Sequence, residues 1–210
     1  HGDDEDLAPD RLRQDFQDVF GRVFRGEDEN DGFNRLVLRA GLNWLQIRLL
    51  RAIAKYLRQA GSTFSQSYME SALAANPEIA RRLLEVFRLR FDPARPLDAD
   101  AKAQAAVHDI ETALDAVASL DEDRILRSFL RVLQAMLRTN AYQRGPDGES
   151  KPYLSFKLDP AQIPDLPAPR PAYEISVYSP RTEGIHLRGG AVARGGIRWS
   201  DRREDFRTEV

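Results

Sequence analysis

The stretch GIHLRGGAVARGGIRW, near the carboxyl end, holds the residues best suited to chemistry. Five of the 13 glycines fall between Gly184 and Gly196, and four of them form two GG pairs that each follow an arginine, Arg188 and Arg194. Glycine has no Cβ, so it lets backbone N–H groups come close to a ligand. Arginine adds a planar, permanently charged fork that pairs with carboxylate or phosphate. One interpretation is therefore an anion-binding loop, in which Arg194 or Arg198 would face the carboxylate of an acidic ligand.

A simpler interpretation of the glycine pairs stays open. Two hairpin turns with positive φ also use GG pairs, and spacing alone favours that use because short glycine motifs are weak signals. The sequence contains neither the dinucleotide fingerprint GxGxxG nor the phosphate loop GxxxxGK[ST]. We therefore predict no nucleotide site in this chain.

Composition excludes several classes of protein. The 31 basic and 33 acidic residues give a formal net charge of −2, whereas a dedicated nucleic-acid binder usually has a basic excess. The absence of cysteine excludes disulfides and thiolate zinc sites. The three histidines are too scattered to predict a metal cluster. With no apolar run of membrane-spanning length and no signal segment, we expect a cytoplasmic protein with neither nucleic acid nor membrane as partner.

Glycine and proline divide the chain into two parts. No glycine occurs between Gly61 and Gly145, whereas eight of the 12 prolines lie between Pro146 and Pro180. The first part is therefore predicted as a bundle of about five or six helices, and the second as turns and strands. The predicted helices span residues 10–24, 31–60 with a break at Gly41, 65–75, 77–90, 98–119 and 121–139.

Alternating apolar residues predict strands in the second part. Leu154, Phe156 and Leu158 share one side of YLSFKL, and YEISVYS likewise places its apolar residues on one predicted covered face (Tyr173, Ile175 and Val177). Ile185 and Leu187 form a shorter pair after the turn PRTEG, which predicts a hairpin. The fold class is thus α+β, a multi-helix bundle followed by a small strand and hairpin segment.

Other polar and aromatic residues are assigned structural roles. Arg48, Arg51, Lys55 and Arg58 lie on one helix side, which we predict to be solvated, with a basic binding face as the alternative. His108 and His186 have no catalytic partner in sequence and are given packing or surface roles. Trp44 is predicted to be core.

Long segments resemble one family. SVYSPRTEGIHLRGGAVARGGIRWSDRREDFRTEV (Ser176 to Val210) closely resembles the start of the catalytic region of the large bacterial NAD-specific glutamate dehydrogenases. LRTNAYQ and KPYLSFKLDP resemble landmarks upstream of that region, and ENDGFNRLVLRAGL fits the same family. The resemblance extends over nearly the whole chain.

The resemblance implies oxidative deamination of L-glutamate to 2-oxoglutarate and ammonium, with NAD⁺ as the hydride acceptor, by a large and homo-oligomeric enzyme. It implies a helical domain (1–140), a proline-rich connector with a short strand (141–172) and the truncated start of an incomplete α/β substrate-binding domain (173–210). Arg194, Gly195 and Gly196 match the KGG-type substrate loop of the smaller glutamate dehydrogenases, with arginine in place of lysine.

The catalytic lysine and aspartate and the NAD-binding domain of the family would lie beyond Val210, where a helix has begun without a stop signal. No catalytic, cofactor-binding or metal residue is therefore assigned. We expect this chain alone to be an inactive fragment that does not bind NAD. The alternative is a self-contained helical module for protein interaction or regulation, without catalysis.

Overall fold

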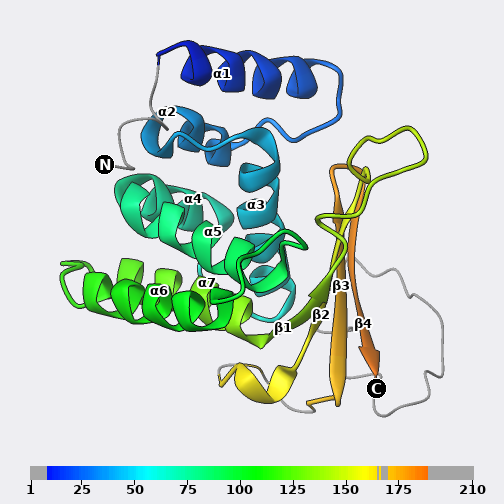
Figure 1. Cartoon of the computed structure of the whole chain (residues 1–210). Coiled ribbons are helices and arrows are strands. Elements are labelled where there is room, and N and C mark those ends of the chain that lie inside the picture. The colour runs from blue at the N-terminus through cyan, green and yellow to red at the C-terminus, as the bar shows by residue number, and fades with distance from the viewer. Residues whose placement is uncertain (1–8, 165, 167–169, 189–210) are drawn as a thin grey trace.

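Helices and a four-stranded sheet lie side by side in the computed structural model, with α3 next to the sheet (Figure 1). The structure describes residues 9–164, 166 and 170–188. Within them the chain forms seven α-helices and two 3₁₀ turns, which confirms the α+β class with more helices than predicted. The helices are α1 (Pro9–Phe24), η2 (Gly32–Arg35), α2 (Leu36–Ala40), α3 (Trp44–Gln59), α4 (Gln66–Ala75), α5 (Pro77–Phe91), α6 (Ala99–Leu114), α7 (Leu120–Ala135) and η3 (Pro160–Gln162). The strands are β1 (Met136–Thr139), β2 (Leu154–Leu158), β3 (Tyr173–Ser179) and β4 (Thr182–Arg188).

Local sequence signals set several helix ends. Gly41 ends α2 in the left-handed conformation, with φ 64°, which confirms the predicted break. Asn43 then starts α3 with a capping box, because its side chain accepts from the backbone of Gln46 while the Gln46 side chain accepts from the Asn43 N–H. Ser65 caps α4 as expected. Asn76 precedes Pro77 as predicted, but its side chain makes no capping bond to α5 and instead donates to the Ala72 carbonyl and Glu122.

One hydrophobic cluster extends from the helices into the sheet. It includes most of the inward face of α3, the apolar stripes of α5 and α7, and Leu154, Phe156 and Leu158 of β2. The burial of these three β2 residues confirms the predicted alternation. Because helices and sheet share this cluster, burial of apolar surface fixes them to each other.

The sheet is antiparallel in the order β1-β2-β3-β4. The predicted hairpin is confirmed, but its turn is tighter than expected. Ser179 pairs with Thr182, so only Pro180 and Arg181 lie in the loop.

Two predicted helix ends are wrong. The helix expected to run to Thr139 ends at Ala135, because Met136 takes extended backbone angles and pairs with Leu158 of β2. Hydrogen bonds to β2 thus replace further helical turns, while Met136 stays in the core. The helix expected to end at Ser119 stops at Leu114, and Ser119 instead caps α7 by accepting from the Glu122 N–H.

The predicted covered face of β3 is also wrong. Its buried residues are Glu174, Ser176 and Tyr178, whereas Tyr173, Ile175 and Val177 are only half-buried. The strand register pairs the first set with the buried β2 residues and with Ile185 and Leu187 of β4. The helix-facing side of β3 is therefore polar, and its partners on the helices explain why.

α1 buries little of its apolar side. Among its apolar residues Phe16, Phe20 and Phe24 are 48%, 63% and 84% exposed, and the last two rings stack. None of the helices in the described part of the chain is long and apolar enough to cross a membrane.

Candidate functional site

The predicted binding residues Arg194, Gly195 and Gly196 lie outside the described residues. The structure does show the strand that leads toward them, since β4 ends at Arg188. The site is therefore built here from the groups that hold β4 and the hairpin in place.

The basic side of α3 is not the solvated face that the sequence predicted. Arg48 is 3% exposed and Arg51 is fully buried, while Lys55 and Arg58 are half-buried. The cause is the acidic run EDEND (27–31), which follows α1 and supplies carboxylates to the arginines of α3. Charge complementarity between this run and the basic side of α3 is the signal in the sequence that could have predicted the contact.

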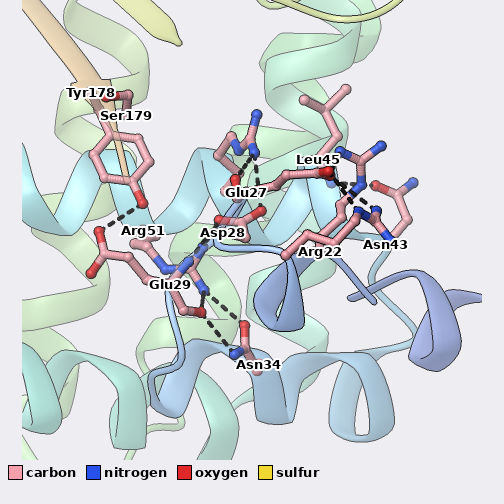
Figure 2. A network of polar contacts seen from close by, with 12 residues as sticks. Arg22, Glu27, Asp28, Glu29, Asn34, Asn43, Leu45, Arg51, Tyr178 and Ser179 are labelled. Atoms are coloured by element: carbon pink, nitrogen blue, oxygen red, sulfur yellow. Dashed lines mark hydrogen bonds and ion pairs between the residues drawn. The ribbon is translucent and has the colours of Figure 1, made fainter. Parts of the chain in front are cut away.

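Arg51 is the centre of a buried polar cluster (Figure 2). Its Nη1 donates to Asp28 Oδ1 at 2.6 Å, and its Nε donates to Asp31 Oδ2 at 2.7 Å. Its Nη2 donates to Asn34 Oδ1 at 2.8 Å and to Asp31 Oδ1 at 2.9 Å. Two bonds to one carboxylate are the fork geometry in which arginine pairs most strongly. The cluster joins α3 to the segment that precedes α2.

Electrostatics keep Arg51 charged. Burial by itself lowers the pKa of Arg51, but hydrogen bonds and charge from Asp31, followed by the charges of Tyr178 and Asp28, raise it above its ordinary value. Arginine with a raised pKa neither donates nor accepts a proton in a reaction. We therefore assign the cluster to structure and positioning, not to acid–base catalysis.

A second group of contacts ties the hairpin to α3 near its turn. The Tyr178 hydroxyl of β3 donates to Glu29 Oε1 at 2.8 Å (Figure 2). Lys55 Nζ lies 3.0 Å from Glu29 Oε2 and 3.7 Å from Glu183 Oε2 of β4. Burial is the main cause that raises the pKa of Tyr178, and burial likewise raises the pKa of Glu183 against the opposing charge of Lys55. The hairpin thus contacts the helices through polar groups at its turn end.

A third contact lies at the other end of the hairpin. The Tyr56 hydroxyl of α3 donates to Glu174 Oε2 of β3 at 2.6 Å. The two residues are 1% and 0% exposed, so this contact is more deeply buried than the Lys55–Glu183 pair. A buried carboxylate is stable only with such partners.

A cavity of about 810 Å³ lies beside the cluster. Trp44, which was predicted to be core, is only half-buried: it packs against the core and forms part of the cavity wall, with Arg22 3.6 Å above its ring centre. Burial and then the charge of Arg48 lower the pKa of Arg22. Arg22 pairs with Glu27, and Arg48 pairs with Asp28, so carboxylates already neutralise these two cations. Other lining residues include Arg25, Tyr153, Val177, Pro180 and Arg181.

The histidines lie elsewhere. His108 is exposed on α6, and His186 of β4 points to the sheet face opposite Ile185 and Leu187, as the alternation predicted. Across the described ranges, no three histidine, cysteine, aspartate or glutamate side chains are grouped so that they could hold a metal ion.

Two known families match this chain. Residues 28–93, from the acidic run to the end of α5, match the family described as glutamate dehydrogenase, helical motif 3. Residues 109–210 match the family described as bacterial NAD-glutamate dehydrogenase, catalytic domain. The Arg51 cluster thus lies in the first match, and the whole sheet lies in the second.

Curated relatives cover nearly the whole chain. An NAD-specific glutamate dehydrogenase of Halomonas elongata is 52% identical over 200 residues, 95% of this chain and 12% of the relative. Proteins of the same name from Pseudomonas aeruginosa and Mycobacterium tuberculosis are 53% and 51% identical, over 98% and 93% of this chain. The chain therefore spans about an eighth of the length of these relatives, 12% to 13%.

Proposed function

Because this chain belongs to the bacterial NAD-specific glutamate dehydrogenase family, we propose that it is part of an enzyme that oxidises L-glutamate to 2-oxoglutarate and ammonium. The observation that carries the proposal is the identity of just over half across nearly all of the chain. The two family matches support it independently, since one is a helical motif and the other a catalytic domain of glutamate dehydrogenases.

NAD is the proposed cofactor of the complete enzyme. The described residues do not fit this group, because the sheet is antiparallel and a dinucleotide fold needs parallel strands joined by helices. The cofactor supplies the hydride chemistry, and no step of that chemistry is assigned to this chain. What the chain contributes is binding and positioning.

Arg194, Gly195 and Gly196 are the proposed contact with the substrate. A guanidinium can pair bidentately with a carboxylate of glutamate or 2-oxoglutarate, and the two glycines let the backbone approach. These groups hold the substrate without reacting with it. Holding the substrate in the reactive orientation lowers the activation barrier.

The wider organisation follows as part of the same proposal. Residues 1–140 form the helical domain, 141–172 the connector and 173–210 the start of the substrate-binding domain. The complete enzyme is proposed to be cytoplasmic and homo-oligomeric. The alternative of an independent regulatory module is less well supported, because a catalytic-domain family matches residues 109–210.

The proposal is tested by steady-state NADH formation. The complete enzyme should turn over glutamate with NAD⁺, and this chain alone should not. In the complete enzyme, Arg194→Ala should lower kcat/KM by the equivalent of about 2 kcal/mol or more, because a charged hydrogen bond to substrate is lost. Arg181→Ala, at the exposed turn of the hairpin, is the matched control and should leave kcat/KM unchanged. An unchanged kcat/KM in Arg194→Ala removes this arginine from the site.

A further inference from the structure

Polar contacts hold both ends of the β3–β4 hairpin against the helical part of the chain. Near the turn, Tyr178 of β3 pairs across the hairpin with Glu183, and its hydroxyl donates to Glu29. At the open end, Glu174 pairs across the hairpin with Leu187 and accepts from the Tyr56 hydroxyl. Leu187 directly precedes Arg188, the last residue of β4. Tyr56 therefore acts at the end from which the chain continues toward Arg194.

We propose that Tyr56 is a positioning residue, which fixes the open end of the hairpin relative to α3 and thereby the start of the segment that binds substrate. The inference rests on the proposed function of Arg194, since it concerns how that site is held. Arg194 lies six positions after Arg188 in sequence. That length of chain spans at most about 20 Å, so the anchor lies within a short tether of the site.

The hydrogen bonds within the sheet do not fix the position of the hairpin relative to α3. The β2–β3 and β3–β4 ladders set the spacing between strands, with Glu174 opposite Leu158 and Leu187. They do not fix the distance between the sheet and the helices, or the position of the sheet along the helices. Apolar packing resists separation but is non-directional. A buried hydrogen bond between one hydroxyl and one carboxylate is directional, and losing it leaves a buried charge without that donor.

The composition of β3 supports the same conclusion. A strand with Leu or Val in place of Glu174 would pack on α3 without the cost of burying a carboxylate. The strand instead places apolar side chains on the other face and acidic and hydroxyl groups toward the helices. Buried polar pairs of this kind specify one arrangement among several of similar packing energy.

The test compares two variants of the complete enzyme that each remove one phenolic hydroxyl from a contact with the hairpin. Tyr56→Phe removes the hydrogen bond to Glu174 at the open end, and Tyr178→Phe removes the hydrogen bond to Glu29 near the turn, where the Lys55–Glu183 pair remains. We expect Tyr56→Phe to raise KM for glutamate on the order of tenfold or more, because small misplacements of binding groups are costly. Tyr178→Phe should leave KM within about twofold of wild type, which is within the spread of such comparisons. Equal effects of the two variants on KM would overturn the proposal.

Amide hydrogen exchange of residues 185–188 provides a second readout that needs no activity. Exchange there should become faster in Tyr56→Phe and stay unchanged in Tyr178→Phe. If the wild-type enzyme does not oxidise glutamate, the proposed function fails. The exchange comparison then still decides whether Tyr56 fixes this end of β4, and unchanged exchange in Tyr56→Phe overturns that part as well.

A double variant separates positioning from stability. Tyr56→Phe with Glu174→Leu replaces the polar pair by apolar groups of similar size, which should restore part of the stability because both polar groups of this contact are removed together. If Tyr56→Phe alone does not fold, the double variant takes its place in the KM comparison. The proposal expects the raised KM to persist in this variant, since the directional contact is still missing. A return of KM to the wild-type value together with stability would show a purely structural role.

Discussion

Arg51 and Asp28 form an ion pair at 2.6 Å between Nη1 and Oδ1, with side chains 0% and 5% exposed. A basic residue on a helix is ordinarily solvated, and here it lies in the core with an acceptor for each of its three side-chain nitrogens. The pair connects two segments that are 23 residues apart in sequence. Its burial makes the stability of the helical part depend on charges that are hidden from solvent.

Removing the cation of this pair should be strongly destabilising. Arg51→Met keeps much of the side-chain volume but removes the cation that Asp28 and Asp31 share, which leaves Asp28 with Arg48 alone and Asp31 without a cationic partner among the ion pairs described above. We expect a loss of about 3–5 kcal/mol in the free energy of unfolding, measured by urea denaturation. Arg13→Met is the matched control, because Arg13 also lies 2.6 Å from an aspartate but is 70% exposed, and it should cost less than about 1 kcal/mol. Equal losses in the two variants would contradict the assignment.

Two glycine substitutions should change stability in opposite directions. Gly41→Ala forces a Cβ into the left-handed region at φ 64°, which should cost about 1–2 kcal/mol. Gly21→Ala lies within α1, where the nearest atom to the added Cβ is Nη1 of the exposed Arg25 side chain at 3.1 Å, and it should stabilise the helix by up to about 1 kcal/mol. Thermal unfolding measures both, and a stabilising Gly41→Ala would refute the explanation for the end of α2.

Asn43 in the capping box of α3 should contribute more to the free energy of unfolding than Asp98 does at the start of α6. Asn43→Ala removes the acceptor for two backbone N–H groups, at Leu45 and Gln46, and should cost about 1 kcal/mol. Asp98→Ala is the control, because Asp98 precedes α6 without a capping bond and makes only an exposed pair with Lys102. Its effect on the free energy of unfolding should be close to zero. A larger loss in Asp98→Ala than in Asn43→Ala would be the contrary result.

The pKa of Glu183, raised mainly by burial, predicts a dependence of stability on pH. A carboxyl whose pKa is raised in the folded state binds more protons folded than unfolded. Its contribution is therefore complete below its ordinary value of 4.5 and declines as pH rises through the folded pKa. Lys55 and Glu29 face this carboxyl, with opposite effects.

Glu183→Gln removes that titration. Between about pH 4.5 and 7, wild-type stability should fall relative to the variant as pH rises, which urea unfolding over a pH series would show. Lys55→Met, measured alongside, should steepen the decline in an otherwise wild-type chain, because the attraction that opposes burial is lost. If the stability of the wild type instead rises relative to Glu183→Gln as pH rises, the attraction of Lys55 outweighs the effect of burial on Glu183.

Most of the fold could be predicted from local patterns. The helix starts at Asn43 and Ser65, the break at Gly41 and the alternation of Leu154, Phe156 and Leu158 each depend on neighbours in sequence, and the structure confirms them. The end of α7 could not be predicted, because the pairing of Met136 with Leu158 is made by a strand that lies 22 residues away in sequence.

The polar side of α3 was missed for a related reason. Periodicity shows which residues share a face, but it does not show what that face contacts. Arg51 on a polar helix side is consistent with water or with a buried carboxylate, and only the tertiary placement of Asp28 and Asp31 decides. The predicted contact of Arg194 with substrate stays a prediction, since it lies beyond the last described strand.

The inverted alternation of β3 has a consequence for how this strand tolerates change. Along most amphipathic strands, the most hydrophobic positions tolerate substitution least. In β3, saturation mutagenesis should show the opposite, with the lowest tolerance at the buried polar positions. Single substitutions of Glu174 should be poorly tolerated because the buried Tyr56 hydroxyl loses this acceptor, while Ile175, one residue on, should accept threonine or glutamine with little penalty.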